Sequence, residues 1–166
     1  SSCVLCEEGK YQSLVGQSVC ENCPAGRYST GFGMISRNQC ESCTSGKYLS
    51  VAGSVREKDC IACPAGKYQT GFGMIDSLNC TDCKAGTYQT SIAVSEQTSC
   101  SFCSPGKYQS GLGMVDEAHC LSCGQGTYQT SSGLVSNALC LLCETGKYQS
   151  GYGAIGCDSC TFGKYQ

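Results

Sequence analysis

Apolar side chains occur along this chain only in short runs, separated by polar and glycine-rich stretches. The longest run, Ala138–Cys143, has six residues, whereas roughly 18 are needed to cross a bilayer. No segment keeps a 3.6-residue apolar period between its glycine and proline positions, so the pattern predicts little or no helix. Runs of the type Lys-Tyr-Gln-Ser/Thr recur and have strand character. We therefore expect short β-strands joined by turns.

A regular cysteine repeat underlies this pattern. Nine C-x-x-C pairs follow one another at intervals of 20 residues in the middle of the chain and 17 at both ends. Such a period is typical of linear arrays in which each unit contacts mainly its neighbours. We predict one continuous array over residues 1–166. Its units, numbered 1 to 9 below, are 3–19, 20–39, 40–59, 60–79, 80–99, 100–119, 120–139, 140–156 and the partial 157–166.

Every unit carries a Gly-x-Tyr motif after the second cysteine of its pair. The glycine predicts a turn with positive φ or a close backbone approach. The tyrosine ring could pack on a disulfide or a neighbouring unit, which its fixed place favours, or it could belong to a ladder that stacks on a ligand. The glycines are Gly9, Gly26, Gly46, Gly66, Gly86, Gly106, Gly126, Gly146 and Gly163, and the tyrosines are Tyr11, Tyr28, Tyr48, Tyr68, Tyr88, Tyr108, Tyr128, Tyr148 and Tyr165.

Alternate units differ after the tyrosine, which makes the full period a 40-residue super-repeat of unit pairs. The even units read Gly-Phe-Gly-Met-Ile or close variants, and the odd units do not. If successive units face opposite sides of a rod, one side carries a periodic contact patch, with flexible methionines suited to contact. Duplication of a two-unit segment without functional meaning is the alternative. The candidate patch residues are Phe32, Met34, Phe72, Met74, Leu112, Met114 and Tyr152.

Composition narrows the class of protein further. The chain has 18 cysteines, no tryptophan and few large apolar residues, so a conventional core of this size cannot be filled. A cysteine content of this level marks disulfide-rich secreted proteins, and it predicts an extracellular or cell-surface location. With 11 basic against 13 acidic residues, the chain lacks the charge of a nucleic-acid binder.

The repeated motif resembles a known extracellular module. Residues 23–28, Cys-Pro-Ala-Gly-Arg-Tyr, and their copy at 63–68 resemble the ephrin-receptor-like cysteine-rich repeat, roughly C-x2-G-x-Y-x4-G-x3-C-x2-C. This repeat is similar to the first module of tumour necrosis factor receptor cysteine-rich domains and is EGF-like in style. The segment from Cys6 to Cys23 matches its short form. The six middle units carry three extra residues, and one has Ala93 where the others have a glycine.

The resemblance implies that the second cysteine of each pair bonds to the first cysteine of the next. In the chain-entropy model, a loop of about 15 residues contributes about 3 kcal/mol. Cys3 and Cys160 are then open ends, and we expect a chain that continues rather than a direct joint between copies. The implied bonds are Cys6–Cys20, Cys23–Cys40, Cys43–Cys60, Cys63–Cys80, Cys83–Cys100, Cys103–Cys120, Cys123–Cys140 and Cys143–Cys157.

Other chemistry has weaker support in the sequence. The cysteine spacing also fits zinc ribbons, but nine equally spaced pairs do not divide into four-cysteine sites. His119 is the single histidine, and no catalytic or phosphate-binding motif occurs, so we expect no enzyme, no metal and no cofactor. Asn79-Cys80-Thr81 is a glycosylation sequon, although a disulfide at its middle residue argues against occupancy.

The sequence therefore predicts a small disulfide-rich tandem repeat rod of short β-hairpins and turns. The leading function is an extracellular structural protein in a filament, flagellar hair (mastigoneme), stalk or matrix fibre, with copies of itself or other filament proteins as partners. The alternative is a receptor or adhesin ectodomain that binds a protein or a glycan. The near-identity of the units favours the structural role, since receptors usually diversify their modules to make one specific site. We expect no nucleic-acid partner and no membrane span within these residues.

Overall fold

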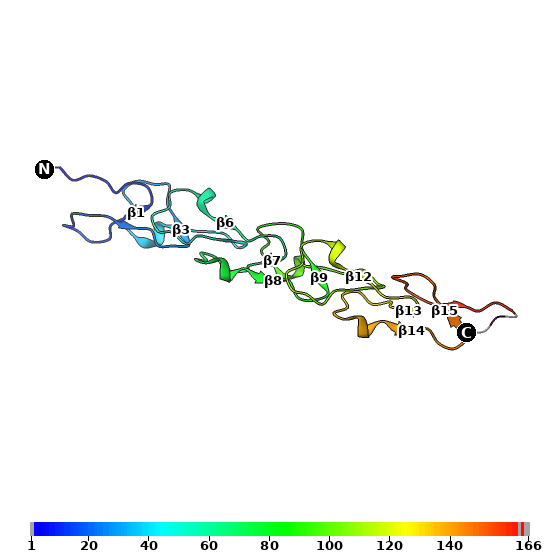
Figure 1. Ribbon diagram of the computed structural model, residues 1–166. Helices are drawn as coiled ribbons and strands as arrows, with labels where there is room; N and C mark the ends of the chain where they lie inside the picture. The colour runs from blue at the N-terminus through cyan, green and yellow to red at the C-terminus, as the bar shows by residue number, and fades with distance from the viewer. Residues whose placement is uncertain (1, 163, 165–166) are drawn as a thin grey trace. The chain divides into compact units, whose positions relative to one another are not determined.

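The computed structural model describes residues 2–162 and 164 (Figure 1). Gly163 and Tyr165, which carry the predicted motif in unit 9, lie outside the described residues. The chain divides into two compact bodies. The N-terminal body contains the residues up to 81 together with 92–97, and the C-terminal body contains 82–91 together with the residues from 98 onward. Each body is described below by itself.

Short antiparallel hairpins are the regular structure of both bodies, and the described residues contain no α-helix. In each hairpin, the lysine, arginine or threonine and the tyrosine of one motif pair with the two residues that follow the next cysteine. Arg27 pairs with Ser42 and Tyr28 with Glu41, for example. Because the second strand belongs to the following unit, each hairpin joins two consecutive units. The predicted fold class, small, disulfide-rich and built of hairpins, is confirmed.

The sixteen strands of the described residues have two residues each and form eight sheets. Within each body, Figure 1 shows the successive hairpins in chain order. The pairs are β1 (Lys10–Tyr11) with β2 (Glu21–Asn22), β3 (Arg27–Tyr28) with β4 (Glu41–Ser42), β5 (Lys47–Tyr48) with β6 (Ile61–Ala62), β7 (Lys67–Tyr68) with β8 (Thr81–Asp82), β9 (Thr87–Tyr88) with β10 (Ser101–Phe102), β11 (Lys107–Tyr108) with β12 (Leu121–Ser122), β13 (Thr127–Tyr128) with β14 (Leu141–Leu142), and β15 (Lys147–Tyr148) with β16 (Asp158–Ser159).

Single turns of 3-10 helix lead into the first cysteine of six pairs. Local side chains cap the turn at Arg37–Gln39 from both directions: Ser36 Oγ accepts from the Asn38 N–H at 3.2 Å, and Gln39 Oε1 accepts from the Ser36 N–H at 3.1 Å. Such reciprocal bonds satisfy backbone donors that a short helix leaves unpaired. The turns are η1 (Arg37–Gln39), η2 (Glu57–Asp59), η3 (Ser77–Asn79), η4 (Gln97–Ser99), η5 (Glu117–His119) and η6 (Asn137–Leu139).

The strands that contain the motif tyrosine also contact the following unit along the edge that the hairpin leaves open. Tyr11 forms a parallel bridge with Met34, and the Gln12 N–H donates to the Met34 carbonyl oxygen at 2.9 Å. These strands therefore have backbone partners on both sides, and the units are joined by hydrogen bonds as well as by disulfides. The same bridge recurs as Tyr28–Ser54, Tyr48–Met74 and Tyr68–Val94 in the N-terminal body, and as Tyr88–Met114 and Tyr108–Leu134 in the C-terminal body.

A third contact joins units that are two apart. Gly26 in unit 2 has a φ of 80°, and a Cβ atom at this position would lie 2.1 Å from the carbonyl oxygen of Gly73 in unit 4. Gly106 approaches Gly153 in the same way in the C-terminal body. The predicted positive φ and close backbone approach are thus both present at the turn glycine. Since the contact skips one unit, it connects even units with even units and odd units with odd units.

Disulfide-bonded cysteines supply most of the interior. Cys23 and Cys43 are fully buried, as are their equivalents Cys63, Cys83, Cys103 and Cys123. Among the described residues, Leu49 is the large apolar side chain that is most completely buried. Every buried polar side-chain atom of this part of the chain has a hydrogen-bond partner. The structure thus replaces a conventional apolar core with disulfides and satisfied polar contacts.

The first glycine of the even-unit sequence makes room for a methionine. A Cβ atom at Gly31 would lie 2.0 Å from Met34 Cε, and the same overlap occurs between Gly71 and Met74. Unit 7 has Ser131 at the position of Gly31 and Leu134 at the position of Met34. In units 2 and 4, the glycine therefore leaves the space that the methionine side chain occupies as it folds back.

We expect Gly31→Ser alone to destabilise the N-terminal body and Met34→Leu to relieve much of that loss. The added Cβ displaces the Met34 methyl group from its place, and Ser with Leu reproduces the combination of unit 7. A double-mutant cycle in urea should give a favourable coupling of about 0.5–1 kcal/mol. Strict additivity of the two substitutions would contradict the explanation.

Candidate functional site

Eight disulfides run along the chain in sequence, and they join the pairs that the family resemblance implies. Their Cα–Cα distances are 5.7 to 5.9 Å. Cys3 is an exposed free thiol and Cys160 a partly buried one. Sixteen of the 18 cysteines are therefore in disulfides and are not available as zinc ligands. Among residues 2–162 and 164, no three or more His, Cys, Asp or Glu side chains gather as a metal site.

Each well-buried tyrosine covers a disulfide of the following unit. Tyr11 packs with Cys23 and Cys40, and Tyr28 forms the equivalent cluster with Cys43, Cys60 and Leu49. Both rings are 8% exposed. The Tyr11 hydroxyl donates to a Glu21 carboxylate oxygen at 2.6 Å, and the Tyr28 hydroxyl to Glu41 at 2.9 Å. The packing interpretation of these two tyrosines is confirmed, since neither ring has a free face for a ligand.

Both hydroxyl groups are harder to ionise than an ordinary tyrosine. Burial, followed by the hydrogen bond to the Glu41 carboxylate, raises the pKa of Tyr28 to about 12. The hydrogen bond to Glu21, followed by burial, raises the pKa of Tyr11. A phenolate at either position would face a carboxylate and could no longer donate a hydrogen bond to it. The folded structure therefore requires the protonated hydroxyl group.

A titration of tyrosine absorbance should show a late phase whose Tyr28 contribution Tyr28→Phe removes and Glu41→Gln shifts to lower pH. The pKa of Tyr28 is about 12 in the folded chain, compared with the reference value of 10.0. A raised pKa means that this group's contribution to stability is complete below pH 10 and is lost as the pH rises through 12. If Glu41→Gln leaves the late phase unchanged, the charged carboxylate of Glu41 is not a cause of the shift.

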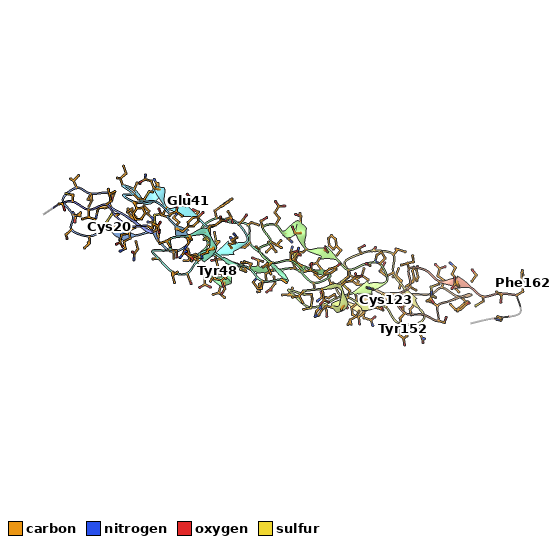
Figure 2. All side chains as sticks on the ribbon, turned by 90° about the horizontal axis from the view of Figure 1, so that it is seen from above. Cys20, Glu41, Tyr48, Cys123, Tyr152 and Phe162 are labelled. Atoms are coloured by element: carbon orange, nitrogen blue, oxygen red, sulfur yellow. A yellow bond between two sulfur atoms is a disulfide. The ribbon has the colours of Figure 1, made fainter. Side chains whose placement is uncertain are left out.

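The residues of the predicted contact patch fall into two groups. The aromatic or leucine position of every even unit is exposed: Phe32 by 63%, Phe72 by 66%, Leu112 by 62% and Tyr152 by 71%. Tyr152 lies at the outer edge of the ribbon in Figure 2. Four equivalent apolar side chains thus face solvent, two in each body, as a contact surface requires.

The patch methionines lie differently. Met34, Met74 and Met114 are only partly exposed, and Met34 packs against the cluster of Tyr11, Cys23 and Cys40. Their backbone carbonyls accept the bonds between consecutive units. The methionines therefore fill space between units, and they are poorly placed to contact a partner.

A second exposed apolar position accompanies the first, and the prediction did not include it. The residue after the methionine position is Ile35, Ile75, Val115 or Ile155, and these side chains are 71%, 54%, 42% and 64% exposed. The signal was present in the sequence, because this position is aliphatic in all four even units. No odd unit combines an aromatic or leucine with an aliphatic residue at these two places. We call the two positions together the apolar pair.

Charged groups form small local pairs on the surface. His119 Nδ1 lies 3.0 Å from Asp116 Oδ1, and both side chains are largely exposed, as expected for a solvated surface histidine. Glu117 accepts from Lys107 Nζ at 3.0 Å, and this contact lowers the pKa of Glu117. Glu117 and His119 belong to the 3-10 turn η5, and exposed pairs of this kind contribute little to stability.

Comparison with known proteins agrees with the repeat. Residues 1–40, which span units 1 and 2, match the family described as tyrosine-protein kinase ephrin type A/B receptor-like. No curated protein matches the chain. In the described residues, no helix is long and apolar enough to span a membrane. The match confirms the ephrin-receptor-like character of the first two units, and the eight sequential disulfides fit a cysteine-rich repeat of this kind.

Proposed function

We propose that this chain is an extracellular structural protein, a component of a filament, flagellar hair (mastigoneme), stalk or matrix fibre. The observation that carries the proposal is the recurrence of the same inter-unit bonds. The bond from Gln12 N–H to the Met34 carbonyl oxygen has equivalents from Leu49 to Met74 and, in the C-terminal body, from Gln109 to Leu134, all between 2.8 and 2.9 Å. A chain that repeats one interface in this way is built as a linear array, which suits an extended structural element.

The disulfides support the extracellular part of this proposal. Structural disulfides in this number persist in oxidising compartments and are rare in a reducing cytosol. The match of residues 1–40 to an ephrin-receptor-like family agrees with such a location.

Electron microscopy of the purified chain is the experiment that tests the structural role. We expect regular filaments or bundles with an axial repeat that corresponds to whole unit pairs. Dispersed single chains at all concentrations, together with capture of a soluble partner, would instead support a receptor or adhesin.

The apolar pairs should mediate lateral association. In the N-terminal body, Phe32→Ser with Phe72→Ser removes two exposed rings while leaving the buried contacts of the fold in place. We expect at least a tenfold rise in the concentration needed for assembly, measured by sedimentation, because each aromatic buried in an interface contributes about 1 kcal/mol or more. Thr30→Ala with Thr70→Ala, at two exposed polar positions of the same two units, provides a control pair. If assembly is unchanged and the fold is intact, the apolar pairs do not form the contact surface.

The second candidate function is a receptor or adhesin ectodomain. Two observations favour it: the ephrin-receptor-like match of residues 1–40, and exposed apolar side chains that differ among units, such as Phe72 and Leu112. A ligand would then be recognised by one unit, and a substitution in that unit alone would abolish binding. Equal effects of substitutions in different even units would favour the structural role.

A further inference from the structure

The sequon Asn79-Cys80-Thr81 lies on the surface of the N-terminal body. Asn79 ends the turn η3, and Thr81 begins the strand β8. Both side chains are exposed, whereas Cys80 between them is 5% exposed. No other unit combines an asparagine before its first cysteine with a serine or threonine after it. The sequon therefore occurs at one junction of units, with Asn79 in unit 4 and Thr81 in unit 5.

The disulfide at the middle residue leaves the sequon accessible. Cys80 has extended backbone angles, φ −78° and ψ 108°, and its sulfur bonds to Cys63. In extended backbone, the two neighbours of a residue point to the side opposite to its own side chain. Asn79 and Thr81 therefore share the outer side, which agrees with their exposure, and the buried sulfur lies on the inner side. The folded disulfide therefore does not cover the asparagine.

The structural role of Asn79 uses only its side-chain oxygen. Asn79 Oδ1 accepts from the Asp76 N–H at 3.1 Å and so closes the cap of η3. In unit 3 the equivalent residue is Asp59, whose Oδ2 accepts from the Arg56 N–H at 3.1 Å. Because aspartate has no side-chain nitrogen and still closes the cap in unit 3, the fold needs only an oxygen acceptor at this position. The nitrogen Nδ2 of Asn79 takes no part in the cap.

We propose that Asn79 carries an N-linked oligosaccharide. The donor class is a lipid-linked diphosphate oligosaccharide of the secretory pathway. The bond between the Asn79 Nδ2 and the sugar C1 forms, the bond between C1 and the diphosphate oxygen breaks, Nδ2 loses one proton, and the lipid diphosphate leaves. The modified amide keeps Oδ1, and the cap bond from the Asp76 N–H is retained. The inference rests on the extracellular placement of the proposed function, and it places a bulky hydrophilic group on unit 4 alone.

Secretion of the chain from eukaryotic cells, followed by intact-mass measurement, tests the site. We expect a mass increase of one oligosaccharide that peptide-N-glycosidase removes, leaving aspartate at position 79. Thr81→Ser should keep the modification, because serine retains the hydroxyl group that the sequon requires. Thr81→Ala lacks this hydroxyl group and should abolish the modification.

Asn79→Asp is the matched control for folding. It keeps the oxygen acceptor, as Asp59 does in unit 3, and removes the nitrogen. We expect it to form the same eight disulfides and to run at the unmodified mass. A wild-type chain of unmodified mass overturns the proposal, and so does an enzyme-sensitive sugar that persists in Asn79→Asp. Filament formation is measured separately, so its failure is distinguishable from failure of the glycosylation site.

Discussion

Replacing both Cys23 and Cys40 by alanine should lower the stability of the N-terminal body by about 2–5 kcal/mol. The bond closes a loop with a sequence separation of 17, and the two cysteines are 0% and 1% exposed beneath the Tyr11 ring. Its loss frees the unfolded chain and also removes packing from the tyrosine. Differential scanning calorimetry of the whole chain should show a lower midpoint for the affected transition. The double substitution avoids an unpaired buried thiol.

Cys3→Ala is the control for this experiment. Cys3 is exposed and outside the eight disulfides, so its replacement should change stability by less than about 0.5 kcal/mol. If the two variants melt at the same temperature, the disulfides do not compensate for the small apolar interior.

A second large effect is expected from Gly106→Ala in the C-terminal body. Gly106 has a φ of 77°, which costs an alanine about 1–2 kcal/mol. A Cβ atom would also lie 2.1 Å from the Gly153 carbonyl oxygen. Because the obstructing atom belongs to backbone, units 6 and 8 must separate, which adds about 1–3 kcal/mol. Urea unfolding should show a loss of stability equal to the sum of the conformational cost and the cost of separating the units.

The matched control is Gly126→Ala, at the same motif position in the next unit. Gly126 has a φ of 74°, but nothing lies within 4 Å of a Cβ atom there. This variant should lose only the conformational cost of about 1–2 kcal/mol. Equal losses in the two variants would show that the approach between units two apart does not contribute to stability.

The turns and short strands of this protein can be predicted from the sequence, because each depends on a few adjacent residues. The glycine of Gly-x-Tyr predicts its own positive φ, as Gly26 shows, and the following residues predict a strand edge. The disulfide pairs follow what the family resemblance implies, because the resembled module joins the second cysteine of one pair to the first cysteine of the next. Eight such bonds are present.

The exposure of the candidate patch residues could not be predicted from the sequence, for a physical reason. Phe32 and Met34 are two residues apart, and both are apolar, so the sequence does not separate a residue that faces solvent from one that faces Tyr11. Only the bridge between Tyr11 and Met34 sets which side chain points inward. The exposed partner of Phe32 is Ile35, which the structure places on the surface.

The cysteine period, the turn glycines and the alternation of even and odd units can be read from the chain, since each recurs at a constant spacing. Two contacts of the folded chain could not be read in this way. Gly26 meets Gly73 across an intervening unit, and Met34 folds over Gly31. Both depend on where the backbone and side-chain atoms of the folded units come to lie, and the spacing of residues along the chain does not determine those positions.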